Sequence, residues 1–215
     1  MKISYAITVH NELEELTKLL DFLNNKIREE DEIVIQYDEG GVTDEVLEFL
    51  KIKKEIHGYT VVGFPLNKDF ASYKNNLKAN CKGDYIFQID ADEIPHEVMV
   101  AYLPEVLETN PVDIIFVPRV NTVNGLTQKH ISKWKWNVNE KGWVNWPDYQ
   151  TRIYRNTEDV TWMNKVHEKI TGYDTFSNFP AEEHWALYHP KQIKRQEQQN
   201  EFYETIKLWK DNLNH

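Results

Sequence analysis

The chain has 215 residues, of which 40% are hydrophobic and 13% aromatic, with only 8 glycines and 8 prolines. This composition excludes a long disordered segment and predicts one globular domain with a sizeable core. The chain contains 25 lysines and arginines and 35 aspartates and glutamates. The resulting formal net charge of −10 opposes nonspecific attraction to nucleic acid or anionic membranes.

Strands and amphipathic helices alternate over the first half of the chain. The predicted order is a strand at 2–9, a helix beginning near Asn11, a strand at 31–37, a helix beginning at Thr43, a strand at 59–64, a helix at 70–80, a strand at 85–90, a helix at 96–109 and a strand at 113–120. Such alternation is typical of a parallel sheet with helices on both faces. We therefore expect an α/β, Rossmann-like first half.

The pattern changes in the second half of the chain. Residues 149–170 predict short strands separated by a polar turn. Pro190 then predicts the start of a long C-terminal helix, whose apolar residues recur at helical spacing. We divide the single domain into a donor-binding half, residues 1–110, and an acceptor half with the C-terminal helix, residues 111–215.

Polar and acidic residues follow each of the first four predicted strands. They are His10 and Glu12, then Asp38, then Asp69, and finally Asp90 and Asp92. The carboxyl ends of parallel strands meet at one edge of the sheet, where ligands bind in open α/β folds. Neither a GxxxxGK nor a GxGxxG loop follows the first strand, which argues against kinase, GTPase and dehydrogenase chemistry.

The stretch YIFQIDADEIP joins a buried strand to three carboxylates, Asp90, Asp92 and Glu93. Carboxylates spaced this closely at a strand end can hold a hard divalent cation against a phosphate. An acidic turn after a buried strand is the competing interpretation, because short acidic motifs recur by chance.

Five motifs in order point to a known family. They are ITVHNELEEL, IQYDEGGVTDEV, NKDFASYKNNLKANCKGDYIFQIDADEIP, YQTRIYRN and VTWMNKVHEKI. Together they resemble the family 2 glycosyltransferases of the GT-A fold, and the last two resemble the branch that contains the lipopolysaccharide core transferases. The resemblance implies an α/β GT-A fold with a mostly parallel central sheet, and transfer of a sugar from a nucleotide diphosphate sugar, usually UDP-linked.

The resemblance also implies a role for each motif residue. The nucleotide-sugar site would contain Thr8, His10, Glu12, Asp38, Asp69, Lys74, Asp90, Ala91 and Arg152. Within it, Asp38 would recognise the base, and Asp69 and Lys74 would lie near the ribose and diphosphate. Asp92, Asp90 and His189 would hold Mn²⁺ or Mg²⁺, which lowers the barrier by stabilising the diphosphate leaving group.

Two departures from the family pattern affect the donor site. Gly41 and Val42 replace the Ser-Thr-Asp turn that many members carry after the second strand. The resemblance therefore supports the assignment of base specificity less directly than the assignment of the metal site. Lys74 replaces a common arginine, which exchanges a bidentate fork for a point charge.

An inverting transferase needs a base that removes the acceptor proton as the hydroxyl attacks the anomeric carbon. The motif KVHEKI occupies the place of the family's second acidic motif, so Glu168 is the first candidate base and His167 the second. In a strand these two side chains would point to opposite faces, and a structural role for both stays open.

Four tryptophans crowd the stretch that follows the last predicted buried strand: Trp134, Trp136, Trp143 and Trp146. They could form a flat platform for a sugar or close the core over the second half, with Trp136 and Trp143 the more exposed. Glu93, although part of the acidic stretch, is expected to cap the next loop or meet the acceptor.

Partners and location follow from the same sequence. The acceptor could be a glycan, a lipid-linked sugar, a protein side chain or a modified nucleic-acid base. The final helix, with Phe202, Tyr203, Ile206 and Trp209, could dock on its own domain, on a second copy in a homodimer or on a membrane surface. A single cysteine, an early acidic N-terminus and the lack of a long apolar run predict a cytoplasmic protein, with peripheral membrane association as the alternative.

The main functional hypothesis is a metal-dependent, inverting glycosyltransferase. One alternative is a non-catalytic nucleotide-sugar-binding protein that keeps the fold and lacks the base. Another is a nucleotidyltransferase, which also combines an α/β sheet with acidic metal ligands.

Overall fold

The computed structural model describes residues 1–198, 200 and 201. Its strands are β1 Ile3–Val9, β2 Glu32–Asp38, β3 Thr60–Phe64, β4 Tyr85–Asp90, β5 Ile94–Pro95, β6 Ile114–Asn124, β7 Val144–Arg155, β8 Thr161–Met163, β9 Lys169–Thr171, β10 Phe176–Asn178 and β11 Leu187–Gln192. In the described part of the chain, nine strands form one sheet in the order β3-β2-β1-β4-β7-β6-β11-β5, with β10 beside β6. The strands β8 and β9 pair separately.

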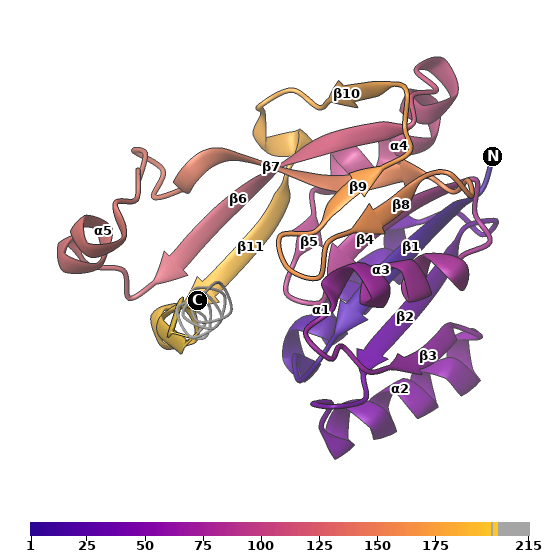
Figure 1. Ribbon diagram of the computed structural model, residues 1–215, viewed down its shortest axis with the longest axis horizontal. Helices are drawn as coiled ribbons and strands as arrows, with labels where there is room; N and C mark the ends of the chain where they lie inside the picture. The colour runs from indigo at the N-terminus through magenta and orange to yellow at the C-terminus, as the bar shows by residue number, and fades with distance from the viewer. Residues whose placement is uncertain (199, 202–215) are drawn as a thin grey trace, which may run out of the picture.

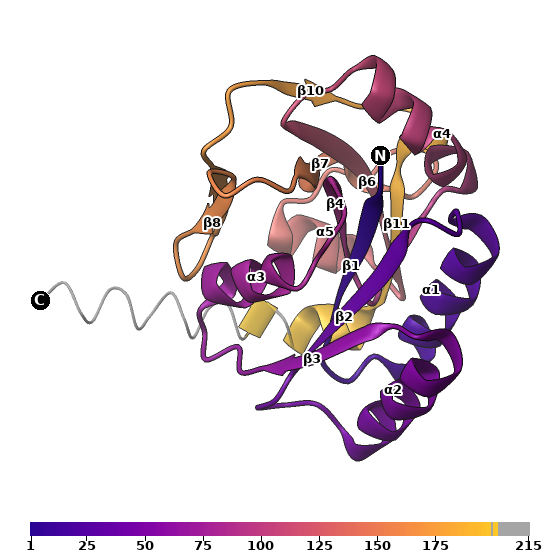
Figure 2. The ribbon, with the colours of Figure 1, turned by 90° about the vertical axis from the view of Figure 1, so that its right-hand side faces the viewer.

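The helices cover both faces of this sheet. They are α1 Leu13–Lys26, α2 Asp44–His57, α3 Phe70–Ala79, α4 Glu97–Thr109 and α5 Gln128–Trp134, with a short 3₁₀ turn at Glu183–Trp185. Figure 2 shows α1, α2 and α4 on one side of the sheet and α3 with β8 on the other. The predicted α/β architecture is therefore confirmed.

Alternation along the central strands produces two hydrophobic cores. Ile7 of β1 and Ile35 of β2 pack with α1, α2 and α4, whereas Ala6, Val34 and Ile86 pack with α3 and the pair β8–β9. Successive side chains of a strand point to opposite faces, so a strand with both faces covered is apolar throughout. This explains the continuous apolar runs in the sequence.

The sheet is mostly parallel. Strands β3, β2, β1 and β4 run parallel to one another, and β6 and β11 are also parallel. Strand β7 lies between β4 and β6 and is antiparallel to both. It brings residues from the second half of the chain beside β4, next to the carboxylates that follow that strand.

The predicted helix start at Pro190 is wrong. Pro190 lies in β11 opposite Thr122 of β6, and the helical residues that follow are 193–198, 200 and 201. On its other side, β11 pairs with β5 only at Leu187 and Tyr188. Proline lacks an N–H, so it is tolerated where one side of a strand has no partner. The four helix residues considered above for docking on a second copy lie outside the described residues.

Residues 125–143 form an arm between β6 and β7 that carries α5. Figure 1 shows this arm projecting away from α1–α4, beyond the ends of β6 and β11. All four tryptophans at 134–146 are only half buried, and they form two pairs, with ring centroids 4.6 Å apart for Trp134 and Trp136 and 4.8 Å apart for Trp143 and Trp146. Neither hydrophobic core of the described residues includes any of the four, which contradicts the interpretation that they close the core. Within the described residues no helix is long and apolar enough to cross a membrane.

Candidate active site

The neighbouring ends of β1 and β4 bring Thr8 opposite Asp90. The Thr8 hydroxyl donates to Asp90 Oδ1 at 2.8 Å, and Arg152 Nη2 of β7 donates to Asp90 Oδ2 at 2.5 Å. The backbone N–H of Ala91 donates to the Thr8 carbonyl at 3.0 Å, and its side chain is buried. Asp90, the first acid of the DAD sequence at residues 90–92, is therefore held by side chains of the two strands that flank β4.

Arg152 and Glu93 form a buried ion pair beneath Asp90. Arg152 is only 3% exposed and Glu93 is fully buried. Glu93 Oε1 accepts from Arg152 at 2.6 Å and from Arg119 at 2.9 Å, and Glu93 Oε2 accepts from the Asp90 N–H at 3.1 Å. The expectation that Glu93 caps the next loop or meets the acceptor is therefore wrong, because a buried carboxylate needs cationic partners.

The charge network also explains the ionisation of Asp90. Burial by itself would raise the pKa of this carboxyl, but the charges of Arg152 and Lys74 and the hydrogen bond from Thr8 hold its pKa well below the ordinary value. The Arg152 guanidinium, which the resemblance implied for the nucleotide-sugar site, is directed at Asp90 and Glu93.

The second acid, Asp92, faces two basic side chains. His189 Nε2 of β11 lies 3.4 Å from Asp92 Oδ2, and Arg195 Nη2 lies 3.5 Å from the same oxygen. Burial would raise the pKa of Asp92, but the contact and charge of His189 and the charge of Arg195 outweigh it, so the pKa is lowered. Arg195 also pairs with Glu12. Arg195 could not be identified from the sequence, because both acids that it contacts are remote from it along the chain.

The orientation of His189 is fixed through Asn121. Asn121 Nδ2 donates to Asp148 Oδ2 at 2.8 Å, so its Oδ1 must face His189 Nδ1, which lies 2.8 Å away. An amide oxygen only accepts, and His189 Nδ1 must therefore carry the hydrogen. In the neutral ring this leaves the Nε2 lone pair directed at the Asp92 carboxylate. Two acceptors facing each other at 3.4 Å require a cation, either a proton on the ring or a metal ion.

Asp148 completes this support. Its carboxylate accepts from Arg119 Nη2 at 2.7 Å as well as from Asn121. Burial would raise its pKa, but Arg119 and the amide hydrogen bonds lower it, so the carboxylate is ionised and can only accept. A continuous set of polar contacts thus links Asp90 to Asp92 through Arg152, Glu93, Arg119, Asp148, Asn121 and His189.

The predicted base-recognition residue, Asp38, lies at the end of β2. Its Oδ1 accepts from the backbone N–H groups of Gly40 at 3.0 Å and Leu66 at 2.9 Å, and its Oδ2 lies 3.3 Å from His10 Nδ1. A Cβ atom on Gly41 would lie 1.7 Å from His10 Cε1. A side chain at position 41 would therefore have to displace the His10 ring, which is about half exposed.

Glu12 organises the loop after β1. Its Oε2 accepts from the backbone N–H groups of His10 at 2.8 Å and Asn11 at 3.0 Å, and its other oxygen accepts from Arg195. The loop therefore reaches the same arginine that faces Asp92, and the structure brings three of the predicted donor-site loops to one edge of the sheet.

The third loop places Asp69 and Lys74 on α3. Asp69 caps this helix by accepting from the Ser72 N–H at 3.0 Å, which explains its lowered pKa. Lys74 Nζ lies 2.6 Å from Glu168 Oε1 and 4.1 Å from the centre of the Trp162 ring. The third loop therefore contributes one structural cap and one cation directed at the candidate base.

The candidate bases Glu168 and His167 lie in the loop between β8 and β9, at residues 164–168. The two residues lie outside any strand, so the alternation of faces expected for a strand does not apply to them, and His167 has a positive φ of 57°. Because the backbone bends here, both residues line one cavity of about 220 Å³ with Phe70 and Val166. The loop is joined to α3 by a hydrogen bond of 2.9 Å from the Phe70 N–H to the Lys165 carbonyl.

The donor atoms suit a divalent ion that retains other ligands. Among residues 1–198, 200 and 201, no three His, Cys, Asp or Glu side chains converge as a complete metal cage. Asp92 and His189 present one carboxylate and one imidazole, while Thr8 and Arg152 engage Asp90. Mg²⁺ and similar ions are commonly bound by one or two carboxylates together with water and substrate phosphates. The residues therefore fit an ion that arrives with a diphosphate.

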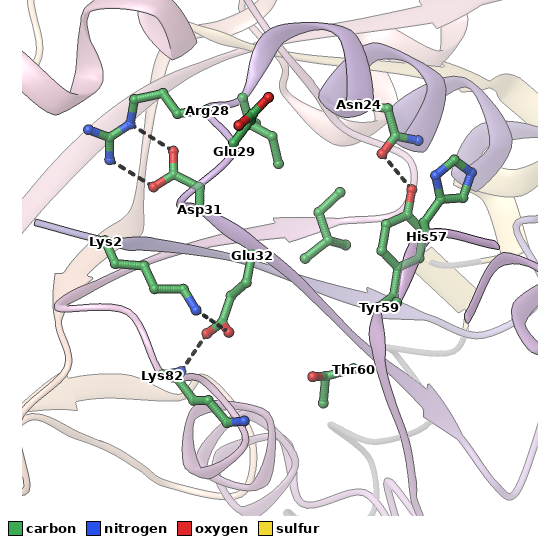
Figure 3. A pocket seen from close by; sticks show the side chains of 13 residues that line it. Lys2, Asn24, Arg28, Glu29, Asp31, Glu32, His57, Tyr59, Thr60 and Lys82 are labelled. Atoms are coloured by element: carbon green, nitrogen blue, oxygen red, sulfur yellow. Dashed lines mark hydrogen bonds and ion pairs between the residues drawn. The ribbon is translucent and has the colours of Figure 1, made fainter. Parts of the chain in front are cut away.

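A cavity of about 490 Å³ lies at the opposite edge of the sheet, at the amino ends of β1, β2 and β3. Figure 3 shows two ion pairs among its charged side chains. Arg28 lies 2.7 Å from Asp31, and Lys2 lies 2.8 Å from Glu32. The predicted donor residues are absent from its lining, so size alone does not make it the candidate site.

A comparison with models of protein families identifies the family of this chain. Residues 4–185 match the family described as Glycosyl transferase family 2, and the chain belongs to this family. No curated protein matches the sequence.

Solved structures of TarS from S. aureus share the fold. TarS 1–349 superposes with a TM-score of 0.63 at 16% identity, covering 88% of this chain and 60% of that chain. Its complex with UDP gives 0.62 at 14% identity, covering 88% and 60%, and its complex with UDP-GlcNAc gives 0.62 at 16% identity, covering 89% and 59%. The predicted GT-A fold is confirmed, and this chain spans about three fifths of TarS 1–349.

Proposed function

We propose that this protein is a metal-dependent, inverting glycosyltransferase that moves a sugar from a UDP-linked donor to an acceptor hydroxyl. The observation that carries the proposal is the contact of the His189 imidazole with the Asp92 carboxylate, 3.4 Å between Nε2 and Oδ2, beside an ionised Asp90. A divalent ion at this position would satisfy both acceptors and would stabilise the charge that develops on a diphosphate leaving group. The crystallisation of TarS with UDP and UDP-GlcNAc supports the choice of donor.

The chain's own residues have distinct parts in donor binding. Asp38 and His10 would face the base, and Thr8 and Asp90 the ribose. Lys74 and Arg195 are the cations that would contact the diphosphate, at the expense of their present partners Glu168 and Glu12. Arg152 would act through Asp90, by keeping that carboxyl ionised and fixed in place.

In the transfer step, Glu168 accepts the proton of the acceptor hydroxyl. The hydroxyl oxygen forms a bond to the anomeric carbon as the bond from that carbon to the diphosphate oxygen breaks, and the electron pair leaves with the diphosphate. Attack from the opposite face inverts the anomeric configuration. When the diphosphate draws Lys74 away, the Glu168 carboxylate is released for proton transfer.

Calorimetry with UDP and Mn²⁺ tests the metal-dependent donor site. Wild-type protein is expected to bind UDP only when Mn²⁺ is present, and Asp92→Ala should lose this binding. Asp21→Asn is the matched control, because Asp21 is an exposed acid with only a 3.8 Å contact to Lys53. Equal binding of UDP by the wild-type protein with and without Mn²⁺ would overturn the proposal.

Glu168→Gln tests the base. This variant should bind UDP and Mn²⁺ as the wild type does, while turnover of UDP-GlcNAc, or of the best donor in a screen of UDP-, GDP- and CDP-linked sugars, falls about 10²- to 10⁴-fold. Unchanged turnover would remove Glu168 from the role and leave His167, which lines the same cavity, as the next variant to measure.

The non-catalytic alternative has one observation in its favour, since Lys74 neutralises Glu168 at 2.6 Å. It predicts donor binding without turnover of any donor by the wild-type protein. The nucleotidyltransferase alternative is not proposed further, because the family match extends over residues 4–185. Membership of the lipopolysaccharide core branch, the division at residue 110 and the cytoplasmic location stay predictions.

A further inference from the structure

A second cavity, of about 280 Å³, lies beside His189 on the side of the arm. Its wall includes Arg119 and Asn121 of β6, Trp136 and Asn145 of the arm and the adjoining β7, and His189 and Lys191 of β11. A cavity of this size is at the lower limit of small-molecule sites and fits one small ligand. His189 borders the cavity and also contacts Asp92, so a ligand here would lie next to the proposed diphosphate position.

The charge of this wall differs from that of the whole protein. The chain carries 35 acidic residues against 25 basic ones, yet the residues that line this cavity include no aspartate or glutamate and do include Arg119 and Lys191. The carboxylates that hold Arg119 in place, Glu93 and Asp148, are not part of the lining. An anion would therefore meet cationic and amide groups here and no carboxylate in the wall.

The same wall has an apolar side. Trp136 is half buried and packs against Trp134 at a ring distance of 4.6 Å, which fixes the position of its indole. Val123 and Val144 also line the cavity. An indole next to amide side chains suits the apolar face of a sugar or polyol together with its hydroxyl groups.

We propose that this cavity is the acceptor site and that it takes a sugar or polyol bearing an anionic group, such as a phosphate or a carboxylate. The anion lies toward Arg119 and Lys191, the carbon skeleton against Trp136, and the reacting hydroxyl on the His189 side. The inference rests on the proposed function, which supplies the donor, and it adds the chemical class of the acceptor.

The test measures the binding of small probes to the whole chain by NMR of the tryptophan indole N–H groups. The signal of Trp136 is assigned from Trp136→Phe. Glucose 6-phosphate and glucuronate are expected to shift this signal saturably, whereas glucose and inorganic phosphate at equal concentration should bind at least about tenfold more weakly, because each makes only part of the contacts. The two anionic sugars distinguish a phosphate from a carboxylate as the preferred group.

Lys191→Gln should weaken the binding of the anionic sugars about tenfold and leave the affinity for UDP with Mn²⁺ within about twofold. Lys194→Gln is the matched control, since Lys194 is exposed in the same segment and does not line the cavity. Equal binding of glucose and glucose 6-phosphate would overturn the proposal.

Competition by saturating UDP and Mn²⁺ separates this site from the donor site. Glucose 6-phosphate should still bind in its presence; complete displacement would show that the probe occupies the diphosphate position and would overturn the acceptor assignment. If UDP and Mn²⁺ fail to bind at all, the proposed function fails, while the indole shifts still report whether the cavity binds anionic sugars.

Discussion

The two acids of the DAD sequence are supported by very different surroundings. Asp90 pairs with Arg152, which also pairs with Glu93, and Arg152 and Glu93 are almost completely buried. Asp92 lies 3.4 Å from His189, and His189 borders the cavity of the arm, whose wall also contains the half-buried Trp136. The first region is part of the protein core, whereas Trp136 of the second region is uncharged and lies outside the two hydrophobic cores of the described residues. The surroundings of Asp90 are therefore more tightly constrained than the arm beside His189.

The largest effect is expected from breaking the buried support. Arg152→Ala would leave the buried carboxylate of Glu93 without one of its two cations and the partly exposed Asp90 without its arginine, and should lower the free energy of unfolding by about 3 to 5 kcal/mol. Urea denaturation measures this loss. Arg155→Ala is the control, because Arg155 pairs with Asp113 at a partly exposed site and should cost about 1 kcal/mol or less. Equal losses in the two variants would contradict the comparison.

The link between the two regions is tested at Asn121. Asn121→Leu removes the acceptor that fixes the proton on His189 Nδ1, and should weaken Mn²⁺ binding with UDP about 10- to 100-fold. Nitrogen NMR of the histidine ring gives an independent readout, since the wild type should show His189 protonated at Nδ1. Asn124→Leu is the control on the same strand. A wild-type ring protonated only at Nε2 would contradict the assignment.

The pH dependence of stability gives a smaller effect. Arg119 and the amide hydrogen bonds outweigh burial and lower the pKa of Asp148 below its ordinary value of 3.8. The unfolded chain therefore takes up this proton first as the pH falls, so the contribution of Asp148 is complete above about pH 4 and is lost as the pH passes through the folded pKa. Stability measured from about pH 5 downward should fall less steeply in Asp148→Asn than in the wild type; parallel curves would contradict this.

The smallest effect is expected in the arm. Lys141 Nζ lies 4.5 Å from the centre of the Trp143 ring and 2.9 Å from Glu183, and both side chains of the ion pair are exposed. Lys141→Ala should cost less than about 1 kcal/mol in thermal unfolding. A loss as large as that of Arg152→Ala would show that the arm is part of the core.

The first half of the fold could be predicted because its signals are local. Apolar runs and helical periodicity located β1 to β4 and α1 to α4, and the acids at the strand ends followed from their order in the chain. The helix start predicted at Pro190 was wrong because proline is common at the first position of a helix. Its actual place in β11 depends on pairing with β6, which is remote in sequence.

The candidate site was less accessible to sequence reasoning. Charged residues are mostly exposed, so nothing in the local pattern indicated that Glu93 and Arg152 would be buried together. Their contact depends on the antiparallel pairing of β7 with β4. The helical pattern after β11 suggested a helix, but it gave no sign that Arg195 would reach Asp92.

The close approach of Gly41 and His10 has a consequence for how this loop can vary. Because any side chain at position 41 would overlap the imidazole, the loop after β2 cannot acquire one while His10 keeps its present rotamer. A member of the family with a larger residue here must place a different or displaced side chain after β1. Positions 10 and 41 are therefore coupled, and a larger residue grafted into the loop after β2 is accommodated together with a change in the His10 side chain.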